Sequence, residues 1–90
     1  MWVYAVSFKL DAQFDYTTLF EELRDSYNWW NYLPNLWLIV TNETAQELWD
    51  RLSDKIRNDD SALVIEVRND TAGWLPAEAW DWINEHVPQP

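Results

Sequence analysis

The sequence contains no cysteine, a single glycine and a single histidine among its 90 residues. Without cysteine the chain has no disulfide framework, no thiolate metal site and no thiol nucleophile. One glycine, Gly73, cannot build a phosphate-binding loop, which needs several glycines at fixed spacing. The histidine, His86, falls in the last turn of a predicted helix and has no partner nucleophile, which indicates a structural or solvent-exposed residue. We therefore expect no catalytic residue, no metal and no cofactor.

Long apolar runs are also missing. The first ten residues, "MWVYAVSFKL", are largely apolar but reach Lys9 and then Asp11, which is too soon for a membrane span. They also lack the basic leader that is typical of a secretion signal. We expect a cytoplasmic protein with no membrane association.

Basic residues are scarce, with six Lys and Arg against sixteen Asp and Glu, and the formal net charge is −10. Proteins that bind nucleic acid gain most of their affinity from clustered cations on phosphates, so direct nucleic-acid binding is not expected. A strongly acidic surface suits a basic protein partner or mimicry of nucleic acid. It also suits simple solubility or adaptation to high salt, and composition alone leaves these alternatives open.

The first quarter of the chain predicts a strand followed by an amphipathic helix. Residues 2–9 are apolar at both alternating sets of positions, as in a central strand. Asp15 is placed to accept backbone N–H groups at the start of the helix. The apolar stripe of this helix consists of Tyr16, Leu19, Phe20, Leu23 and Tyr27.

The stretch "YNWWNYLPNLWL", residues 27–38, predicts a hairpin. Its two arms, "WWNYL" and "LWLIVT", are rich in aromatic and β-branched residues, and Pro34-Asn35 between them is typical of a tight turn. Adjacent strand residues point to opposite faces of a sheet, so Trp29 and Trp30 cannot both enter the core beneath the helices. The other face needs a cover, for which we expect the C-terminal helix or a second subunit in preference to a ligand.

The second half repeats the pattern of the first. Thr44 and Glu47 fit a capping box, and "ALVIEVR" predicts a last strand. The helix between them carries an apolar stripe formed by Ala45, Leu48, Trp49, Leu52 and Ile56. The resulting β-α-β-β-α-β order predicts an α+β, ferredoxin-like two-layer sandwich with an antiparallel sheet.

A tryptophan-rich C-terminal helical extension is predicted over about residues 74–87, with Pro76 in its first turn. Trp82 is expected to point away from its apolar stripe of Ala79, Trp80, Ile83 and Val87. The whole chain, residues 1–90, is predicted to be a single domain with a core over about residues 1–70. The terminal Pro-Gln-Pro is expected to fray.

The segments "VYAVSFKL", "LWLIVT" and "GWLPAEAWDWI" resemble those of small bacterial and phage proteins termed SinR-like. That family is related in fold to the small CRISPR-associated integration subunit, so the resemblance implies a ferredoxin-like homodimer. The CRISPR-associated relatives place an aspartate at the end of the first strand, where paired copies hold a divalent metal. Lys9 occupies the matching position here, and its ammonium repels a divalent cation. Asp11, two residues on, is a weak substitute.

Two groups of residues are candidates for partner binding. The first, which we call the acidic face, lies on the outward sides of the two predicted helices and consists of Glu21, Glu22, Asp25, Glu47, Asp50 and Asp54. The second group, candidates for an aromatic interface, consists of Trp29, Trp30, Trp37, Trp74 and Trp82.

The favoured hypothesis is a non-catalytic acidic protein-interaction module that forms a homodimer. It would act as an inhibitor or nucleic-acid mimic on a basic nucleic-acid-binding or defence protein. The alternatives are a divergent metal-dependent nuclease and an antitoxin-like partner protein.

Overall fold

The structure is a computed structural model that describes residues 1–88, so the expectation of fraying at residues 89–90 lies outside the described part. Its elements, in chain order, are β1 (Trp2–Lys9), α1 (Thr17–Arg24), β2 (Asn28–Trp30), β3 (Leu36–Thr41), α2 (Ala45–Leu52), the 3-10 helix η1 (Ser53–Lys55), β4 (Ser61–Glu66) and α3 (Ala77–His86).

The four strands form one sheet in the order β2-β3-β1-β4, and every pair of neighbours is antiparallel. The prediction of an α+β chain with an antiparallel sheet is therefore confirmed. β1 lies inside the sheet, with Val6 opposite Trp37 of β3 on one side and Val64 of β4 on the other. This position explains why β1 is apolar at both alternating sets of positions.

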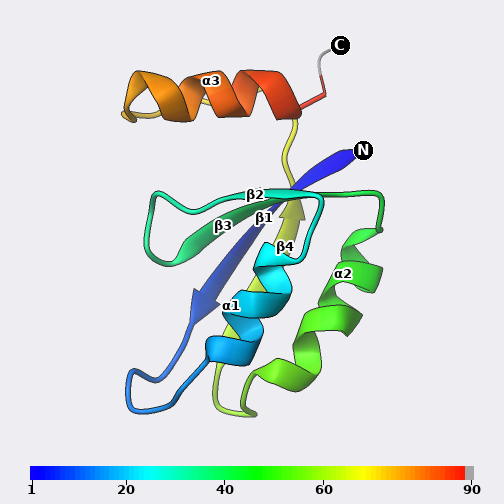
Figure 1. Cartoon of the computed structure of the whole chain (residues 1–90), viewed down its shortest axis with the longest axis vertical. Coiled ribbons are helices and arrows are strands. Elements are labelled where there is room, and N and C mark those ends of the chain that lie inside the picture. Colours follow the sequence, from blue (N-terminus) through cyan, green and yellow to red (C-terminus); the bar gives the residue numbers. More distant parts are fainter. Residues whose placement is uncertain (89–90) are drawn as a thin grey trace.

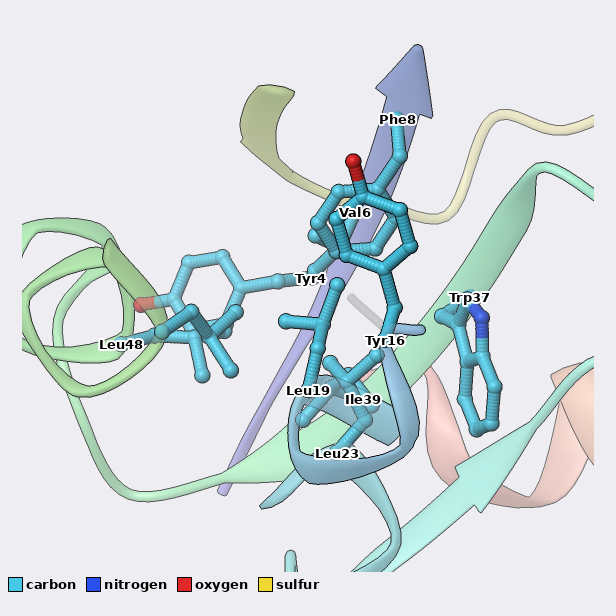
Figure 2. Close-up of a cluster of buried hydrophobic side chains, with 10 residues drawn as sticks. Tyr4, Val6, Phe8, Tyr16, Leu19, Leu23, Trp37, Ile39 and Leu48 are labelled. Carbon is cyan, nitrogen blue, oxygen red and sulfur yellow. The ribbon is translucent and has the colours of Figure 1, made fainter. Parts of the chain in front are cut away.

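Helices α1 and α2 cover one face of the sheet. Figure 2 shows Leu19 and Leu23 of α1 packed against Val6 of β1 and Ile39 of β3, with Leu48 of α2 alongside. We call this group the α1/α2-side cluster, and its buried members are Tyr4, Val6, Phe8, Tyr16, Leu19, Leu23, Trp37, Ile39, Leu48 and Leu52.

Helix α3 lies across the sheet from α1 and α2 (Figure 1). Its residues Ile83 and Val87 pack against Val3, Leu38 and Val40 on the opposite face, and these five form the α3-side cluster. Helix α3, one of the covers considered for the second face, thus packs against it. Partly buried side chains, among them Trp30, Trp80 and Trp82, pack around the cluster.

The orientation expected for Trp82 is wrong. Its ring packs against the α3-side cluster, and its centroid lies 6.5 Å from that of Trp30. In the helical repeat of α3, Trp82 lies next to the apolar stripe. Its ring is large enough to reach Trp30 of β2 from that position.

The hairpin forms, but its first arm is shorter than predicted. β2 ends at Trp30, and the turn closes where the N–H of Leu36 donates to the carbonyl of Leu33, with Pro34-Asn35 between them. Strand pairing stops at Trp30 because the side-chain amide of Asn31 donates to the carbonyls of Leu33 and Leu36. A side chain thus binds the backbone groups that a longer strand would have paired.

The start of α2 follows the predicted capping chemistry, whereas Tyr16 takes the N-cap position of α1 and its side chain makes no capping hydrogen bond. Asp15 Oδ1 accepts the N–H of Thr17, the first residue of α1, at 2.9 Å. Thr44 and Glu47 form the complete capping box of α2, as predicted. Helix α3 begins at Ala77, so Trp74 lies before it and Pro76 takes the N-cap position.

Candidate functional site

Arg51 of α2 faces α1 and binds groups from α1, from the residues after α1 and from the loop before α2. Its Nη2 lies 2.8 Å from Glu43 Oε1, and its Nε lies 3.1 Å from Glu43 Oε2. On α1 its Nη1 donates to the backbone carbonyl of Glu22 at 3.0 Å, while Nη2 also reaches the hydroxyl of Ser26. The guanidinium fork therefore holds α1, α2 and the loop before α2 together.

This arrangement changes the electrostatics of one side of the acidic face. Hydrogen bonds from the Arg51 guanidinium lower the pKa of Glu43, an effect that burial of the carboxyl partly opposes. Lys55 lies 3.8 Å from Glu22 and 2.9 Å from Asp54, and its hydrogen bond lowers the pKa of Asp54. Two of the six residues of the acidic face, Glu22 and Asp54, are thus paired with cations.

The other four carboxylates of the acidic face form no ion pair within residues 1–88, and all four residues are exposed: Glu21, Asp25, Glu47 and Asp50. Two of them have neutral partners. Glu47 accepts the N–H of Thr44 in the capping box, and Asp50 accepts a hydrogen bond from the Gln46 amide. The structure therefore leaves four exposed carboxylates without a cationic partner, three on α1 and α2 and one, Asp25, at the C-cap of α1.

The aromatic candidates divide between the two faces of the sheet. Trp37 is only 4% exposed and packs between Phe20 of α1, with ring centroids 5.9 Å apart, and Trp29 of β2, at 5.2 Å. The guanidinium of Arg24 lies 5.8 Å from the Trp37 ring centroid. Trp37 is therefore a core residue, and the more exposed Trp29 ring lies between it and the solvent.

Trp30 and Trp82 belong to the opposite face, where a hydrogen-bonded histidine joins α3 to β2. The Trp82 carbonyl can only accept, so the Nδ1 of His86, 2.8 Å away, is the donor. Its Nε2 then accepts from the side-chain amide of Asn28 at 3.0 Å. His86 also stacks on the Trp82 ring at 4.3 Å. Of the two alternatives expected for this histidine, these contacts favour the structural role.

Trp74 differs from the other four aromatic candidates because its side chain is 100% exposed. It lies in the segment between β4 and α3, where residues 67–76 form neither helix nor strand. A fully exposed tryptophan is uncommon in a soluble fold, and tryptophan is enriched among residues that anchor protein partners.

Near the end of β1, the Tyr16 hydroxyl connects Asp11 to Asp60. The Tyr16 hydroxyl donates to Asp60 at 2.7–2.8 Å and accepts the N–H of Asp11. Burial opposes ionisation of Asp60, but the N–H of Arg57 and the Tyr16 hydroxyl outweigh it and lower the pKa of Asp60. Within residues 1–88 no group of three or more metal-ligating side chains converges on one point.

Sequence reasoning missed Glu43 and Arg51 as a pair. They lie eight positions apart, outside the three- and four-residue spacings that join side chains along one helix. Glu43 also precedes α2, so only the folded loop brings it to Arg51. No periodic signal in the sequence could have revealed this pair.

Among residues 1–88, no helix combines the length and apolar character that crossing a membrane requires. No match was found when the chain was compared with protein-family models, with curated proteins or with solved structures.

Proposed function

We propose that the chain is a non-catalytic acidic interaction module that binds a basic nucleic-acid-binding or defence protein and blocks its nucleic-acid site. The observation that carries this proposal is the set of four exposed, unpaired carboxylates on α1, on α2 and at the C-cap of α1. Fixed negative charges on a rigid helical surface attract a basic patch in the way that a row of phosphates does.

The local geometry supports a preorganised surface. Arg51 holds the end of α1 against α2 through the Glu22 carbonyl and Ser26, so the two helices present their carboxylates together. The capping box further fixes the first turn of α2, where Glu47 lies. Charges held in place lose little conformational entropy when a partner binds.

The finer fold assignment is part of the same proposal. The β-α-β-β-α-β order and the strand order β2-β3-β1-β4 support a ferredoxin-like core, with α3 as an addition on the second face. A fold relationship to the CRISPR-associated integration subunit is proposed on the sequence resemblance alone. The metal-dependent activity of that subunit is not carried over, because Lys9 stands at the position of its aspartate.

Competition against DNA tests the proposal. A basic DNA-binding domain loaded with fluorescent duplex DNA is titrated with this protein, and DNA release is followed by anisotropy. We expect release at low salt and a steep loss of competition as salt rises, because screening weakens attraction between exposed charges. Release that does not depend on salt would contradict the electrostatic mechanism.

A matched pair of variants locates the binding surface. The test variant combines Glu21→Gln, Asp25→Asn, Glu47→Gln and Asp50→Asn, which keep the size and hydrogen-bonding capacity of the side chains. The control neutralises four exposed carboxylates elsewhere, at Asp70, Glu78, Asp81 and Glu85. Each variant changes the net charge from −10 by four, to −6. We expect only the test variant to lose competition, and equal losses would show that net charge alone is responsible.

A further inference from the structure

The two edges of the sheet differ in length. β2 forms one edge with three residues, whereas β4 forms the other with six. Short edge strands resist pairing with other chains, while a long uncovered edge is a template for an added strand. The β4 edge is therefore where this fold can accept a further strand.

The hydrogen bonds of the sheet show which groups of β4 are free. The N–H of Val67 donates to the carbonyl of Val3, which makes these two a hydrogen-bonded pair. Pairing alternates along antiparallel strands, so Leu63 and Ile65 also direct their backbone groups toward β1. The backbone groups of the even-numbered residues consequently point away from the sheet, at Ala62, Val64 and Glu66.

Beside this edge, on the α1/α2 face, lies a groove of about 250 Å³. Helix α2 forms one wall with Ala45, Gln46 and Trp49, and β4 forms the other with Ala62, Leu63 and Val64. A side chain that is opposite Val64 on an added strand would point into this groove, because directly opposed residues share a face.

On the α3 face of the same edge, α3 leaves part of the sheet uncovered. Leu63 and Ile65 are 57% and 54% exposed, whereas Ala62 and Val64 on the same strand are partly buried against the α1/α2-side cluster. An added strand would cover both with apolar side chains that alternate with those entering the groove.

We propose that an extended segment of a partner protein, with apolar and basic residues in alternation, adds to the β4 edge as a fifth strand. The apolar side chains cover Leu63 and Ile65. The basic side chains enter the groove, lie along the Trp49 ring and reach Asp50, which binds Gln46 at the groove wall. The basic character of this segment rests on the proposed function, whereas the edge geometry is independent of it.

Charge selects this occupant over a second copy of the chain. The β4 edge is flanked by Asp50, whose partner Gln46 lines the groove, and by Asp60 before the strand, whereas Glu66 at its end is paired with Arg68 at 3.3 Å. A second copy with a net charge of −10 would bring the same carboxylates to its own β4 edge. Like charges at close range oppose pairing, and a cationic strand removes that opposition.

Three blocked ten-residue peptides serve as probes: alternating valine and arginine, five valines followed by five arginines, and alternating valine and glutamate. We expect the first to bind at least tenfold more tightly than either of the others, measured by Trp fluorescence and calorimetry. The second peptide has the same charge and composition as the first. Equal binding of these two would overturn strand addition and leave the electrostatic function standing.

Amide hydrogen exchange provides a residue-level readout. The alternating basic peptide should slow exchange at Ala62, Val64 and Glu66, whose N–H groups face outward. Exchange at Leu63 and Ile65 should change little, because their N–H groups already pair with β1. Uniform protection of β4, or protection confined to the acidic face, would contradict the proposed edge site.

Val64→Pro is the sharpest variant, because proline removes an outward N–H and leaves the ladder to β1 intact. We expect at least tenfold weaker binding of the alternating basic peptide and an unchanged response in the DNA competition. If this variant fails to fold, Leu63→Ser combined with Ile65→Ser tests the exposed apolar side. Unchanged peptide binding would overturn the inference.

Sedimentation of the free protein tests the competing occupant. A dimer that Val64→Pro dissociates would show that a second copy takes the β4 edge and would overturn the proposal. DNA competition without peptide binding would contradict the edge site alone. Peptide binding without DNA competition would contradict the proposed function alone.

Discussion

On one face of the sheet, α1 and α2 bury long aliphatic side chains completely, including Leu19, Leu23, Leu48 and Leu52. On the other face, α3 is held by Ile83 and Val87, by partly buried tryptophan rings and by the hydrogen bond from Asn28 to His86. The first face is a core of ten buried aliphatic and aromatic side chains, and the second is a smaller core of five aliphatic side chains bordered by partly buried aromatic rings.

This difference indicates unequal local stability. The free energy gained from burial grows with the apolar area removed from water, so the α1/α2 face contributes most of it. Helix α3 should therefore open at lower free energy than the rest of the fold. The two faces also divide the candidate surfaces: the acidic face lies over the stable core, whereas the exposed Leu63 and Ile65 lie where α3 does not reach.

The largest expected effect comes from Trp37→Ala on the α1/α2 face. Truncation leaves a cavity between Phe20 and Trp29, and the free energy of unfolding should fall by about 3–5 kcal/mol. Trp74→Ala is the matched control, because this ring is fully exposed and its loss should cost less than about 0.5 kcal/mol. Urea unfolding followed by far-UV circular dichroism measures both, and similar losses would contradict the assignment of Trp37 to the core.

A smaller effect is expected from Ile83→Ala on the α3 face. The substitution should lower the free energy of unfolding by about 2–3 kcal/mol, near the lower end of the range for Ile→Ala. The reason is that we expect α3 to separate from the sheet without unfolding the other core. Hydrogen exchange should accelerate within Ala77–His86 while β1 and β3 stay protected. Equal acceleration in every strand would show that both faces unfold as one unit.

The smallest expected effect concerns the ion pair between Glu43 and Arg51 on the α1/α2 face. A double-mutant cycle on Glu43→Gln and Arg51→Met should give a coupling free energy of about 1 kcal/mol, since both side chains are partly exposed. The folded-state pKa of Glu43 is lowered, so this stabilisation is fully present above the ordinary glutamate pKa and is lost as pH falls through the lowered one. Coupling that did not change between neutral and acid pH would contradict this assignment.

Local patterns in the sequence predicted much of the fold. The double alternation of residues 2–9 predicted a central strand, and the capping residues Thr44 and Glu47 marked the start of α2. The opposite orientations of Trp29 and Trp30 followed from strand geometry alone. The length of β2 could not be predicted, because its end depends on where the Asn31 amide finds carbonyl acceptors after the turn has closed.

The candidate site was predicted less completely. Charge counting identified the acidic face, yet it treated Glu22 and Asp54 as equal to Glu21 and Asp25. The difference arises from Lys55 and Arg51, which lie beside some of these carboxylates only after α1 and α2 pack together. An ion pair depends on distances of a few ångströms between elements, and such distances do not appear in residue order.

The sequence by itself determined the alternation of strands and helices, the face toward which each strand residue points and the net negative charge, because these follow from local periodicity and composition. Only the tertiary structure decided which carboxylates remain unpaired, which tryptophan is fully exposed and how far α3 covers the sheet. It also decided that β4 and not β2 presents the long edge. Those properties depend on packing between segments far apart in the chain, which a local pattern does not specify.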